Sequence, residues 1–336
     1  MDRRSLYFTR PHETELRRTE FEPTADEVVV ETRVSAISSG TELLVYRGEA
    51  PTDLPADATI EALEGDLSFP LRYGYAAVGE VVATGAEVDD AWQGRDVFAF
   101  NPHESRFAAR PADLVRVPED VAPAAMALLP SVETATSLVL DGRPRVGERV
   151  VVFGAGPVGL CTVAVLSAFP LDWLVVVDPL AGRRGRALEL GADDAVAPDR
   201  VASAVGADGS DHDGADLVYE LSGRPEALDD AVGVTGYDSR VVVGSWYGTR
   251  RASLDLGGDF HRDRVSIESS QVSTLAPDSR GRWTKDRRME TALERLRGLE
   301  TDSLISHRVP FEDAPEAYRL LDERPEEALQ VLLTYS

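Results

Sequence analysis

Three glycines stand at a spacing that lets a backbone loop hold a dinucleotide. In the stretch VVVFGAGPVGL, Gly154, Gly156 and Gly159 form the pattern G-x-G-x-x-G between an expected strand and an expected helix. The first glycine permits a tight turn, the second lets the backbone approach a pyrophosphate, and the third lets the helix pack closely against the strand. Pro157 and Val158 begin the helix, whose free N–H groups and positive dipole end favour phosphates. The stretch predicts a dinucleotide site, with an ordinary strand–turn–helix corner as the alternative.

An acidic residue follows at the separation that ribose binding requires. Asp178 ends the second expected strand, 178 − 154 = 24 residues after the first glycine, where a carboxylate binds the ribose hydroxyls. Because a carboxylate repels a 2′-phosphate, Asp178 favours NAD over NADP. Arg183 and Arg184 keep NADP open, since either guanidinium can pair with a phosphate.

Small and polar residues at the ends of the later strands are expected to line the nicotinamide, because ligands of open parallel sheets bind at the carboxyl ends of the strands. These residues are Ser222, Gly223, Gly244, Ser245, Trp246, Ser270 and Gln271. Ser245 and Gln271 are the preferred candidates, and simple packing is the alternative for each residue of the set.

The elements that must position these residues follow from the apolar pattern. Between residues 148 and 246, strand-like runs such as ERVVVFG, WLVVVD and SRVVVGSW alternate with helical runs such as PVGLCTVAVLSAF. This alternation predicts an α/β fold with a parallel sheet covered on both faces. The chain before residue 130 predicts a compact β-rich module. An amphipathic helix is expected over residues 286–300, and the acidic stretch 206–216 is interpreted as an exposed loop rather than a metal site.

The charge of the chain limits its partners. Its 336 residues include 59 acidic and 35 basic side chains, a net charge of −24. A surface this negative repels phosphate backbones and anionic lipids, which argues against nucleic-acid and membrane partners. Lys285 is the only lysine, and this acid-rich, lysine-poor composition resembles that of salt-accumulating halophiles and favours a haloarchaeal origin. A GC-rich genome would explain the arginine content but not the excess of acid.

Targeting and cysteine signals are sparse. No apolar run reaches the length of a bilayer span, and MDRRSLYFTRPHETEL lacks the apolar stretch of a signal peptide, so a cytoplasmic location is expected. Cys161 is the single cysteine and lies in an apolar run, which excludes an intrachain disulfide and a cysteine-based zinc site.

Several stretches together resemble the medium-chain dehydrogenase/reductase superfamily over nearly the whole chain: SGTELLVYRGE, YGYAAVGEVVATG, RVGERVVVFGAGPVGL, VVVD and DAPEAYRLLDERPEEALQVLLTY. NPHESRFAARPADLVRVP and FHRDRVSIESSQVS resemble the branch that includes bacteriochlorophyllide a dehydrogenase. The resemblance implies a Rossmann parallel sheet inserted between two halves of a GroES-like β-rich catalytic domain. It places the catalytic domain at residues 1–130, the Rossmann domain at 131–272 and the C-terminal return at 273–336. It also implies a homodimer formed near residues 265–272.

Zinc-containing members of the superfamily hold their catalytic metal at three positions that differ in this chain. By the resemblance, Ser39 replaces a ligand cysteine, Tyr75 a ligand histidine and Leu129 the third ligand. Glu42 and Ala76 replace the acids that accompany the first two ligands, and the cysteine-rich structural-zinc lobe is missing. Zinc requires three or four N, S or O ligands. We therefore expect the loop VSAISSGTELLVYRGE to shape the substrate and nicotinamide pocket without a metal.

Without zinc, hydrogen-bond donors must handle the substrate oxygen during hydride transfer. By the resemblance, Thr41 matches the hydroxyl that relays the alcohol proton, and Tyr75 is expected to donate its phenol into the same cavity. His103 is the expected general acid/base, since histidine titrates near neutral pH, and Glu42 is expected to orient a neighbouring donor. The alternatives are a turn threonine, a core tyrosine, a structurally bonded histidine and a salt-bridged glutamate.

Three further polar residues have weaker assignments. The resemblance places Glu133 and Thr134 on the hinge segment that passes the nicotinamide. His261, beside Arg262 and Arg264, is interpreted as part of a solvated charged face.

These observations predict a zinc-independent, NAD(P)-dependent oxidoreductase that transfers a hydride between nicotinamide and a small alcohol/carbonyl substrate. One alternative is an enone or quinone reductase, because activated double bonds need less polarisation of an oxygen. The other is a non-catalytic dinucleotide-binding sensor or assembly protein, because three lost ligand positions are also what a decayed active site would show.

Overall fold

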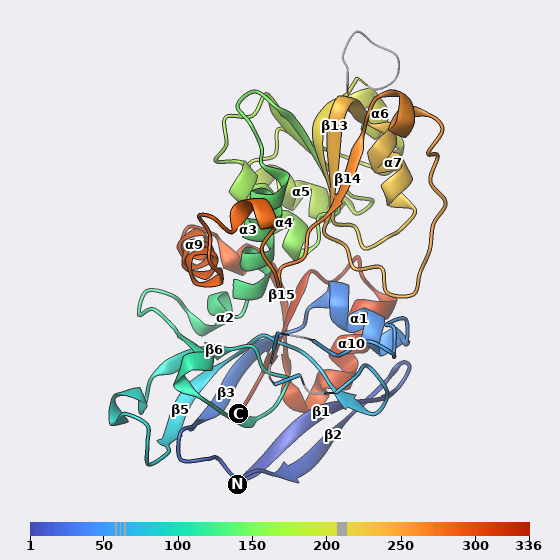
Figure 1. Ribbon diagram of the computed structural model, residues 1–336. Coiled ribbons are helices and arrows are strands. Elements are labelled where there is room, and N and C mark those ends of the chain that lie inside the picture. The colour runs from blue at the N-terminus through green and yellow to red at the C-terminus, as the bar shows by residue number, and fades with distance from the viewer. Residues whose placement is uncertain (58, 61, 64, 207–213) are drawn as a thin grey trace. The chain divides into compact units, whose positions relative to one another are not determined.

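The chain divides into two compact units. The computed structural model describes residues 1–57, 59–60, 62–63, 65–206 and 214–336. Unit 1 combines Met1–Pro130 with Glu300–Ser336, and unit 2 spans Ser131–Leu299 (Figure 1). Most of the acidic stretch 206–216 lies outside the described residues, so the loop expected there stays a prediction. Within the part of the chain described, no helix combines the length and the apolar character that a bilayer span requires.

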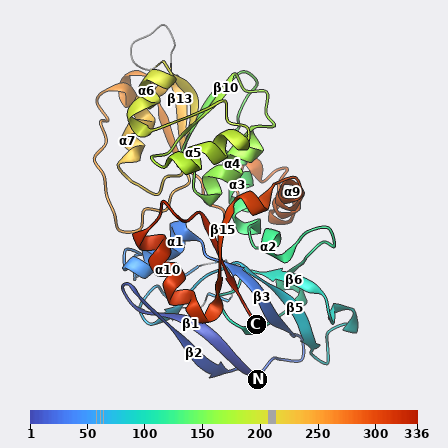
Figure 2. The same ribbon diagram turned by 180° about the vertical axis from the view of Figure 1, so that it is seen from behind.

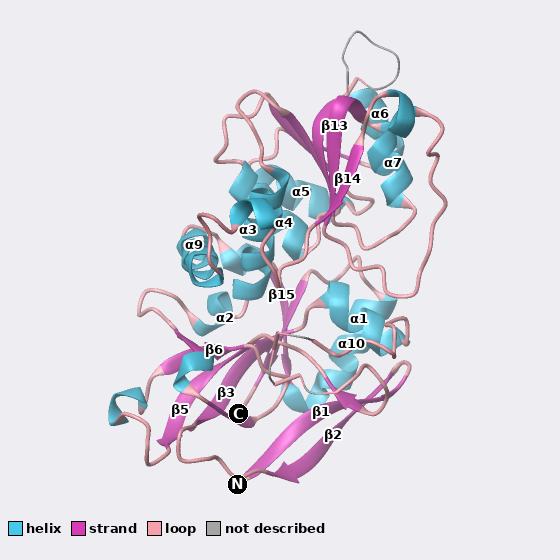
Figure 3. Cartoon of the chain, viewed as in Figure 1, coloured by secondary structure: helices cyan, strands magenta, loops and turns pink. Residues whose placement is uncertain are grey.

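Unit 2 contains the predicted parallel sheet. Its strands are β9 (Arg149–Phe153), β10 (Trp173–Val177), β11 (Asp194–Val196), β12 (Ala215–Glu220), β13 (Thr235–Val243) and β14 (Ser266–Ser269). They lie in the order β11-β10-β9-β12-β13-β14, and each neighbouring pair is parallel. Figure 3 draws the strands as magenta arrows, with β13 and β14 labelled side by side. Buried valines stand side by side across the sheet, with Val151 in register with Val175 and Val218. This doubly wound order reverses between β9 and β12.

Helices cover both faces of this sheet. They are α3 (Leu129–Gly142), α4 (Pro157–Leu166), α5 (Ala181–Glu189), α6 (Val201–Ala204), α7 (Ala227–Gly233), α8 (Asp259–Arg262) and α9 (Lys285–Arg297), with the short turns η3 (Pro198–Arg200) and η4 (Pro277–Ser279). Helices α4 and α5 lie on one face, and α6 and α7 lie on the other (Figure 2). Right-handed crossovers require this division once the strand order reverses. The predicted Rossmann arrangement is confirmed.

A buried ion pair joins helices α9 and α3 within unit 2. Arg288 of α9 is 2% exposed and donates to Glu133 Oε1 of α3 at 2.8 and 3.2 Å. Its guanidinium also binds a serine hydroxyl of α3 and two carbonyls of the segment 272–274. The resemblance places the start of the C-terminal return at residue 273. Unit 2 instead extends to Leu299, and unit 1 resumes at Glu300.

Unit 1 is built from both ends of the chain. Its strands are β1 (Asp2–Arg10), β2 (Glu13–Glu20), β3 (Val28–Ala36), β4 (Leu71–Arg72), β5 (Ala77–Thr84), β6 (Asp96–Ala99), β7 (Arg106–Ala109), β8 (Leu114–Arg116), β15 (Ile305–Pro310) and β16 (Gln330–Thr334). One sheet has the order β2-β1-β4 and the other β15-β16-β3-β5-β6-β8, with β7 paired to β3. Because β16 pairs with β3, the C-terminal residues complete a sheet that the N-terminal residues begin. The parallel sheet is thus inserted between two halves of a β-rich domain, as predicted.

The stretch Val34–Glu49 folds as a strand end and a helix, which corrects the loop expected there. Strand β3 ends at Ala36, and α1 (Ser39–Arg47) follows. Glu42 in its first turn accepts the Ser38 N–H at 2.7 Å, much as the acid of a capping box does. Gly48 ends the helix at φ +72°, in the left-handed region that glycine adopts freely. An acid at the start and a glycine at the end therefore define α1.

Helix α10 (Ala314–Glu323) packs against α1 (Figures 1 and 2). Its Tyr318 is fully buried and meets Phe8 of β1 edge-on, with ring centroids 5.2 Å apart. The remaining short elements of unit 1 are α2 (Pro123–Met126), η1 (Asp90–Trp92), η2 (Pro111–Asp113), η5 (Thr301–Ser303) and η6 (Phe311–Asp313). The phenol of Tyr318 is thereby brought to the start of α1 from the far end of the chain.

The buried pair of unit 2 gives a stability prediction. Replacing Arg288 with alanine leaves the Glu133 carboxylate buried without its guanidinium, and we expect the free energy of unfolding to fall by about 3–5 kcal/mol. Urea unfolding followed by tryptophan fluorescence measures the change. Arg186→Ala, which removes an exposed ion pair with Glu189 in α5, is the matched control and should have a much smaller effect. A similar midpoint for the two variants would contradict the assignment.

Candidate functional site

The glycine loop of unit 2 has the geometry that its spacing predicts. Gly154 follows β9 at φ +96°, and a Cβ there would lie 2.6 Å from the carbonyl carbon of Leu221, just beyond β12. A Cβ at Gly159 would lie 1.9 Å from the Gly154 oxygen, so helix α4 packs directly on the turn. At Gly156 a Cβ would meet nothing within 4 Å. The middle glycine therefore leaves space beside the backbone, at the point where the order of the strands reverses.

The start of α4 can hold an anion. Gly156 is the N-cap, Pro157 is the first helical residue, and Val158 follows. The N–H groups of the first turn have no intrahelical partner, and the helix dipole adds positive potential there. A pyrophosphate is the group that such a turn suits.

Asp178 holds the glycine loop through hydrogen bonds from backbone N–H groups. Its carboxylate is 4% exposed and accepts the N–H groups of Ala155 and Leu180, each at 2.8 Å. Each oxygen keeps a further lone pair for a ribose hydroxyl. Arg184 donates instead to the carbonyls of Asp178 and Pro179, which ties its guanidinium to the backbone. Near Asp178, burial lowers the pKa of the Arg183 guanidinium, and the carboxylate opposes this shift.

The turns after β12 and β13 are joined by hydrogen bonds. The Gly223 N–H donates to Ser245 Oγ at 2.9 Å, and the Gly244 N–H donates to the Glu220 carbonyl at 3.0 Å. Ser222 donates its N–H and its hydroxyl to the Glu220 carboxylate. The sequence patterns indicate these serines and glycines but not Glu220. The feature that could have indicated Glu220 is an acidic residue at the end of the apolar strand ADLVYE.

The turn after β14 and the hinge residues are committed to contacts within unit 2. The Ser270 hydroxyl donates to Asp141 at 2.6 Å, and Gln271 is exposed and accepts the Thr274 N–H at 3.1 Å. Glu133 forms the buried pair described above. These contacts are compatible with the packing alternative for Ser270, Gln271 and Glu133, and their role beside the nicotinamide stays a prediction.

Three other side chains of unit 2 lie at or near the surface. Trp246 is 36% exposed, Thr134 is partly exposed in α3, and His261 is exposed at the end of α8. The position of His261 agrees with its interpretation as part of a solvated face.

Unit 1 gathers three hydroxyls at the start of α1. The Tyr75 phenol lies between the hydroxyls of Ser38 and Thr41, in a short hydrogen bond to the first and 3.2 Å from the second. All three side chains are partly exposed. Burial raises the pKa of Tyr75, which keeps its phenol neutral. The family resemblance indicates Thr41 and Tyr75 but not Ser38. The feature that could have indicated Ser38 is a small hydroxyl residue just before a helix.

The structure corrects the expectation that His103 is a general acid/base. Its ring is fully buried, with Nδ1 2.7 Å from Ser35 Oγ and Nε2 2.9 Å from a Glu42 carboxylate oxygen. A Cβ at Gly74 would lie 2.6 Å from the ring, so backbone packs directly on it. The Ser35 hydroxyl in turn lies 2.8 Å from the Tyr335 phenol. Both ring nitrogens are therefore engaged within the unit, and neither is left for a substrate.

Glu42 connects this buried network to the hydroxyl cluster. Its carboxylate is fully buried and takes hydrogen bonds from the Tyr318 phenol, the Ser38 N–H and His103. With the His103 Nε2 protonated, all three partners donate, and no charge on the ring is needed. Glu42 thereby holds the backbone of Ser38, whose side chain binds Tyr75. This position is the one expected of a residue that orients a neighbouring donor.

The donor set of unit 1 does not fit a catalytic zinc ion. Ser39 and Tyr75 bear neutral hydroxyls, and Leu129 is a fully buried hydrocarbon. Glu42 and His103 are conventional ligand types, and both are committed to the buried network. Within the described ranges, no group of three histidine, cysteine, aspartate or glutamate side chains is arranged to hold a metal. Zinc in proteins needs such N, S or O ligands.

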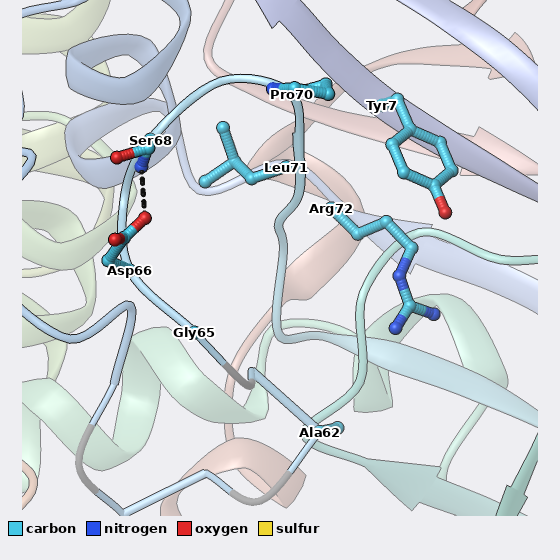
Figure 4. Close-up of a pocket in the computed structure, with 8 residues that line it drawn as sticks. All are labelled: Tyr7, Ala62, Gly65, Asp66, Ser68, Pro70, Leu71 and Arg72. Atoms are coloured by element: carbon cyan, nitrogen blue, oxygen red, sulfur yellow. Dashed lines mark hydrogen bonds between the residues drawn. The ribbon is translucent and has the colours of Figure 1, made fainter.

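A cavity of about 260 Å³ in unit 1 shares no lining residue with this cluster (Figure 4). It is lined by Tyr7, Ala62, Gly65, Asp66, Ser68, Pro70, Leu71 and Arg72. Arg72 pairs with the buried carboxylate of Glu104, and the Ser68 N–H donates to Asp66 at 2.9 Å. Because its charged wall is paired within the unit, we assign no chemical step to this cavity.

The raised pKa of Tyr75 predicts a pH dependence. An unfolded tyrosine ionises near pH 10, whereas folded Tyr75 keeps its proton, so the unfolded state binds fewer protons above that pH. The free energy of unfolding should therefore fall as pH rises above about 10. Replacing Tyr75 with phenylalanine should make this fall shallower by up to about 1.4 kcal/mol per pH unit. Urea unfolding between pH 8 and 11 measures both slopes, and equal slopes would contradict the shift.

Several known proteins resemble this chain. Residues 157–289 match the family described as zinc-binding dehydrogenase. The chain is 31% identical over 323 residues to L-threonine 3-dehydrogenase of Streptomyces coelicolor, covering 84% of this chain and 89% of the relative. It is 26% identical over 333 residues to D-guloside 3-dehydrogenase of Escherichia coli, covering 93% of each.

A solved structure shows the same fold. An alcohol dehydrogenase from Escherichia coli CFT073, described as short-chain and complexed with NADH, superposes with a TM-score of 0.79 at 20% identity, over 99% of both chains. The identity to the threonine dehydrogenase, over most of both chains, establishes the family. The chain therefore belongs to the zinc-binding dehydrogenase family and is an NAD(P)-dependent oxidoreductase.

Proposed function

We propose that the protein transfers a hydride between NAD and a small alcohol/carbonyl substrate without a zinc ion. The observation that carries the proposal is the hydroxyl cluster of Ser38, Thr41 and Tyr75 at the start of α1. It occupies the part of the chain where the family resemblance expects the metal ligands. Relatives described as dehydrogenases of threonine, guloside and sorbitol support an alcohol as the substrate class.

The preference for NAD rests on Asp178. Its carboxylate stands at the end of β10, beside the glycine loop, and would repel a 2′-phosphate. The guanidinium of Arg184 is held by backbone carbonyls of the same turn, which leaves Arg183 as the remaining candidate for a phosphate contact. The carboxylate of Asp178 at this turn supports NAD.

The hydroxyl cluster can manage the proton that accompanies the hydride. During alcohol oxidation, the hydride leaves the carbinol carbon for the nicotinamide, and the hydroxyl proton must pass to an acceptor. We assign that acceptor to Thr41, which passes its own proton to Tyr75 as Tyr75 passes one to Ser38. Ser38 is partly exposed and releases a proton to solvent water, so each hydroxyl ends neutral. In the reverse direction a neutral hydroxyl donates to the carbonyl oxygen as the hydride arrives.

Zinc independence rests on the chemistry of the donor set. The aligned positions offer two hydroxyls and a hydrocarbon in place of ligands, and Glu42 and His103 serve the buried network. The zinc-free branch that includes bacteriochlorophyllide a dehydrogenase therefore stays the preferred subgroup. The homodimer, the haloarchaeal origin and the cytoplasmic location also stay predictions.

Two alternatives are separable by assay. An enone or quinone reductase would turn over an α,β-unsaturated ketone and leave a simple secondary alcohol unchanged. A dinucleotide sensor or assembly protein would bind NADH and turn over neither. The ordered hydroxyl cluster favours the alcohol/carbonyl reaction, because reduction of an activated double bond needs less help at the oxygen.

The cofactor preference gives a first prediction. Fluorescence titration in about 2 M KCl, which screens the net charge of −24, should show tighter binding of NADH than of NADPH. The Asp178→Asn variant loses the charge and one of the two acceptor oxygens that bind Ala155 and Leu180, so the affinity ratio should move toward NADPH even if both affinities fall. Arg184→Gln is the control, since its guanidinium binds backbone and should leave the ratio nearly unchanged. Tighter binding of NADPH by the natural protein would overturn the assignment.

The hydroxyl cluster gives a second prediction. Replacing Tyr75 with phenylalanine should lower kcat for the alcohol by about a hundredfold or more, while the affinity for NADH stays the same. Tyr73→Phe, at a buried neighbour whose ring meets Tyr75 edge-on, is the matched control and should retain activity.

A test for bound metal belongs to the same experiment. Dialysis of the natural protein against EDTA should leave kcat unchanged, and elemental analysis should find less than stoichiometric zinc. Loss of activity on chelation, restored by zinc, would refute the metal-free mechanism even if Tyr75 proves essential.

A further inference from the structure

Strand β12 of unit 2 ends in a carboxylate that the dinucleotide pattern does not explain. Glu220 is fully buried and follows Val218 and Tyr219, which are also fully buried. Burying a carboxylate is costly unless donors surround it. The hydrogen-bond donors around Glu220 therefore show which segments its carboxylate holds in place.

Those donors come from two different turns. One carboxylate oxygen of Glu220 accepts the Ser222 N–H at 2.8 Å and the Ser222 hydroxyl, both from the turn after β12. The other oxygen accepts the phenol of Tyr247, from the turn after β13. Burial raises the pKa of Tyr247, and the negative charge of Glu220 raises it further, so the phenol stays a donor. One carboxylate thus joins the two turns.

Further hydrogen bonds join the same two turns. The Glu220 carbonyl accepts the N–H groups of Gly244 and Ser245 at 3.0 and 3.3 Å. Ser245 Oγ accepts the Gly223 N–H at 2.9 Å, and Arg250 donates to the Gly223 carbonyl at 2.7 Å. The turns after β12 and β13 therefore form a single hydrogen-bonded assembly with Glu220 at its buried centre.

This assembly lies on one side of the switch point. A Cβ on Gly154 would touch Leu221 and Ser222, so the glycine loop borders the assembly directly. Asp178, at the end of β10, is on the opposite side of β9 in the strand order. A doubly wound sheet binds one mononucleotide over each half, with the ribose-binding acid marking the adenosine half. The β12–β13 turns therefore belong to the nicotinamide half.

We propose that Glu220 is a positioning residue for the nicotinamide half of the cofactor, acting through the turns Ser222–Gly223 and Ser245–Tyr247. It touches no cofactor atom itself. It holds both turns in one arrangement, and the nicotinamide mononucleotide binds against that arrangement. This inference rests on the proposed cofactor function and deepens it.

The test compares two ligands on the full chain. Adenosine diphosphate ribose carries the adenosine half and the pyrophosphate but lacks the nicotinamide ring. In Glu220→Gln, an amide N–H₂ must face a donor in one of the two turns, so the assembly loosens. We expect the affinity for NADH to fall about tenfold and the affinity for adenosine diphosphate ribose to change less than about twofold. Calorimetry in about 2 M KCl measures both.

Two other variants complete the comparison. Tyr247→Phe removes one donor, and it should weaken NADH binding alone and by a smaller factor. Asp178→Asn should weaken both ligands together, because it lies on the adenosine side. If Glu220→Gln does not fold, judged by circular dichroism, Tyr247→Phe and Ser245→Ala carry the test.

Each outcome bears on the proposal. Equal loss of both ligands in Glu220→Gln would show a general role in folding, and unchanged binding of both would show that the carboxylate positions nothing; either result overturns the inference. The proposed function fails separately, when the natural protein binds neither ligand or binds NADH without turnover of any alcohol. Binding without turnover would leave the Glu220 result standing.

Discussion

A buried carboxylate must be surrounded by donors, and this requirement organises unit 1 around Glu42. Its partners come from the start of α1, from His103 before β7 and from Tyr318 in α10. Because an unpaired carboxylate in apolar surroundings is costly, these segments can meet only in an arrangement that satisfies it. The hydroxyl cluster at the start of α1 is thereby positioned by a group that has no access to a substrate.

In unit 2, buried carboxylates at the ends of two strands hold neighbouring loops in the same way. Asp178 holds the glycine loop through the Ala155 N–H, and Glu220 holds the turn after β12 through Ser222. Both carboxylates are buried, and both bind backbone N–H groups of loops at the ends of strands. A loop needs such anchoring because its backbone lacks the ladder of hydrogen bonds that orders a strand. The sheet supplies rigid strand ends, and the acids transmit that rigidity to the turns.

Much of the fold could be predicted because its signals are local. The strands of unit 2 are continuous apolar runs, and the glycine spacing and Asp178 stand at the expected places along them. Helix α1 was missed because its short sequence resembles a loop of the family, and only Glu42 and Gly48 mark its ends. The boundary expected at residue 273 differs from the end of unit 2 at Leu299, because α9 belongs to unit 2 through contacts distant in the chain, among them the ion pair of Arg288 with Glu133.

The sequence by itself determined the parallel sheet, the dinucleotide loop and the presence of hydroxyls at Thr41 and Tyr75, because these depend on periodicity and side-chain chemistry. It could not decide what His103 does. That histidine meets Glu42 across 61 residues of chain, and Glu42 meets Tyr318 across 276. Only the tertiary structure brings these groups together and removes the ring from solvent. The physical reason is that a histidine is an acid/base or a structural donor according to its neighbours, and those neighbours are distant in the chain.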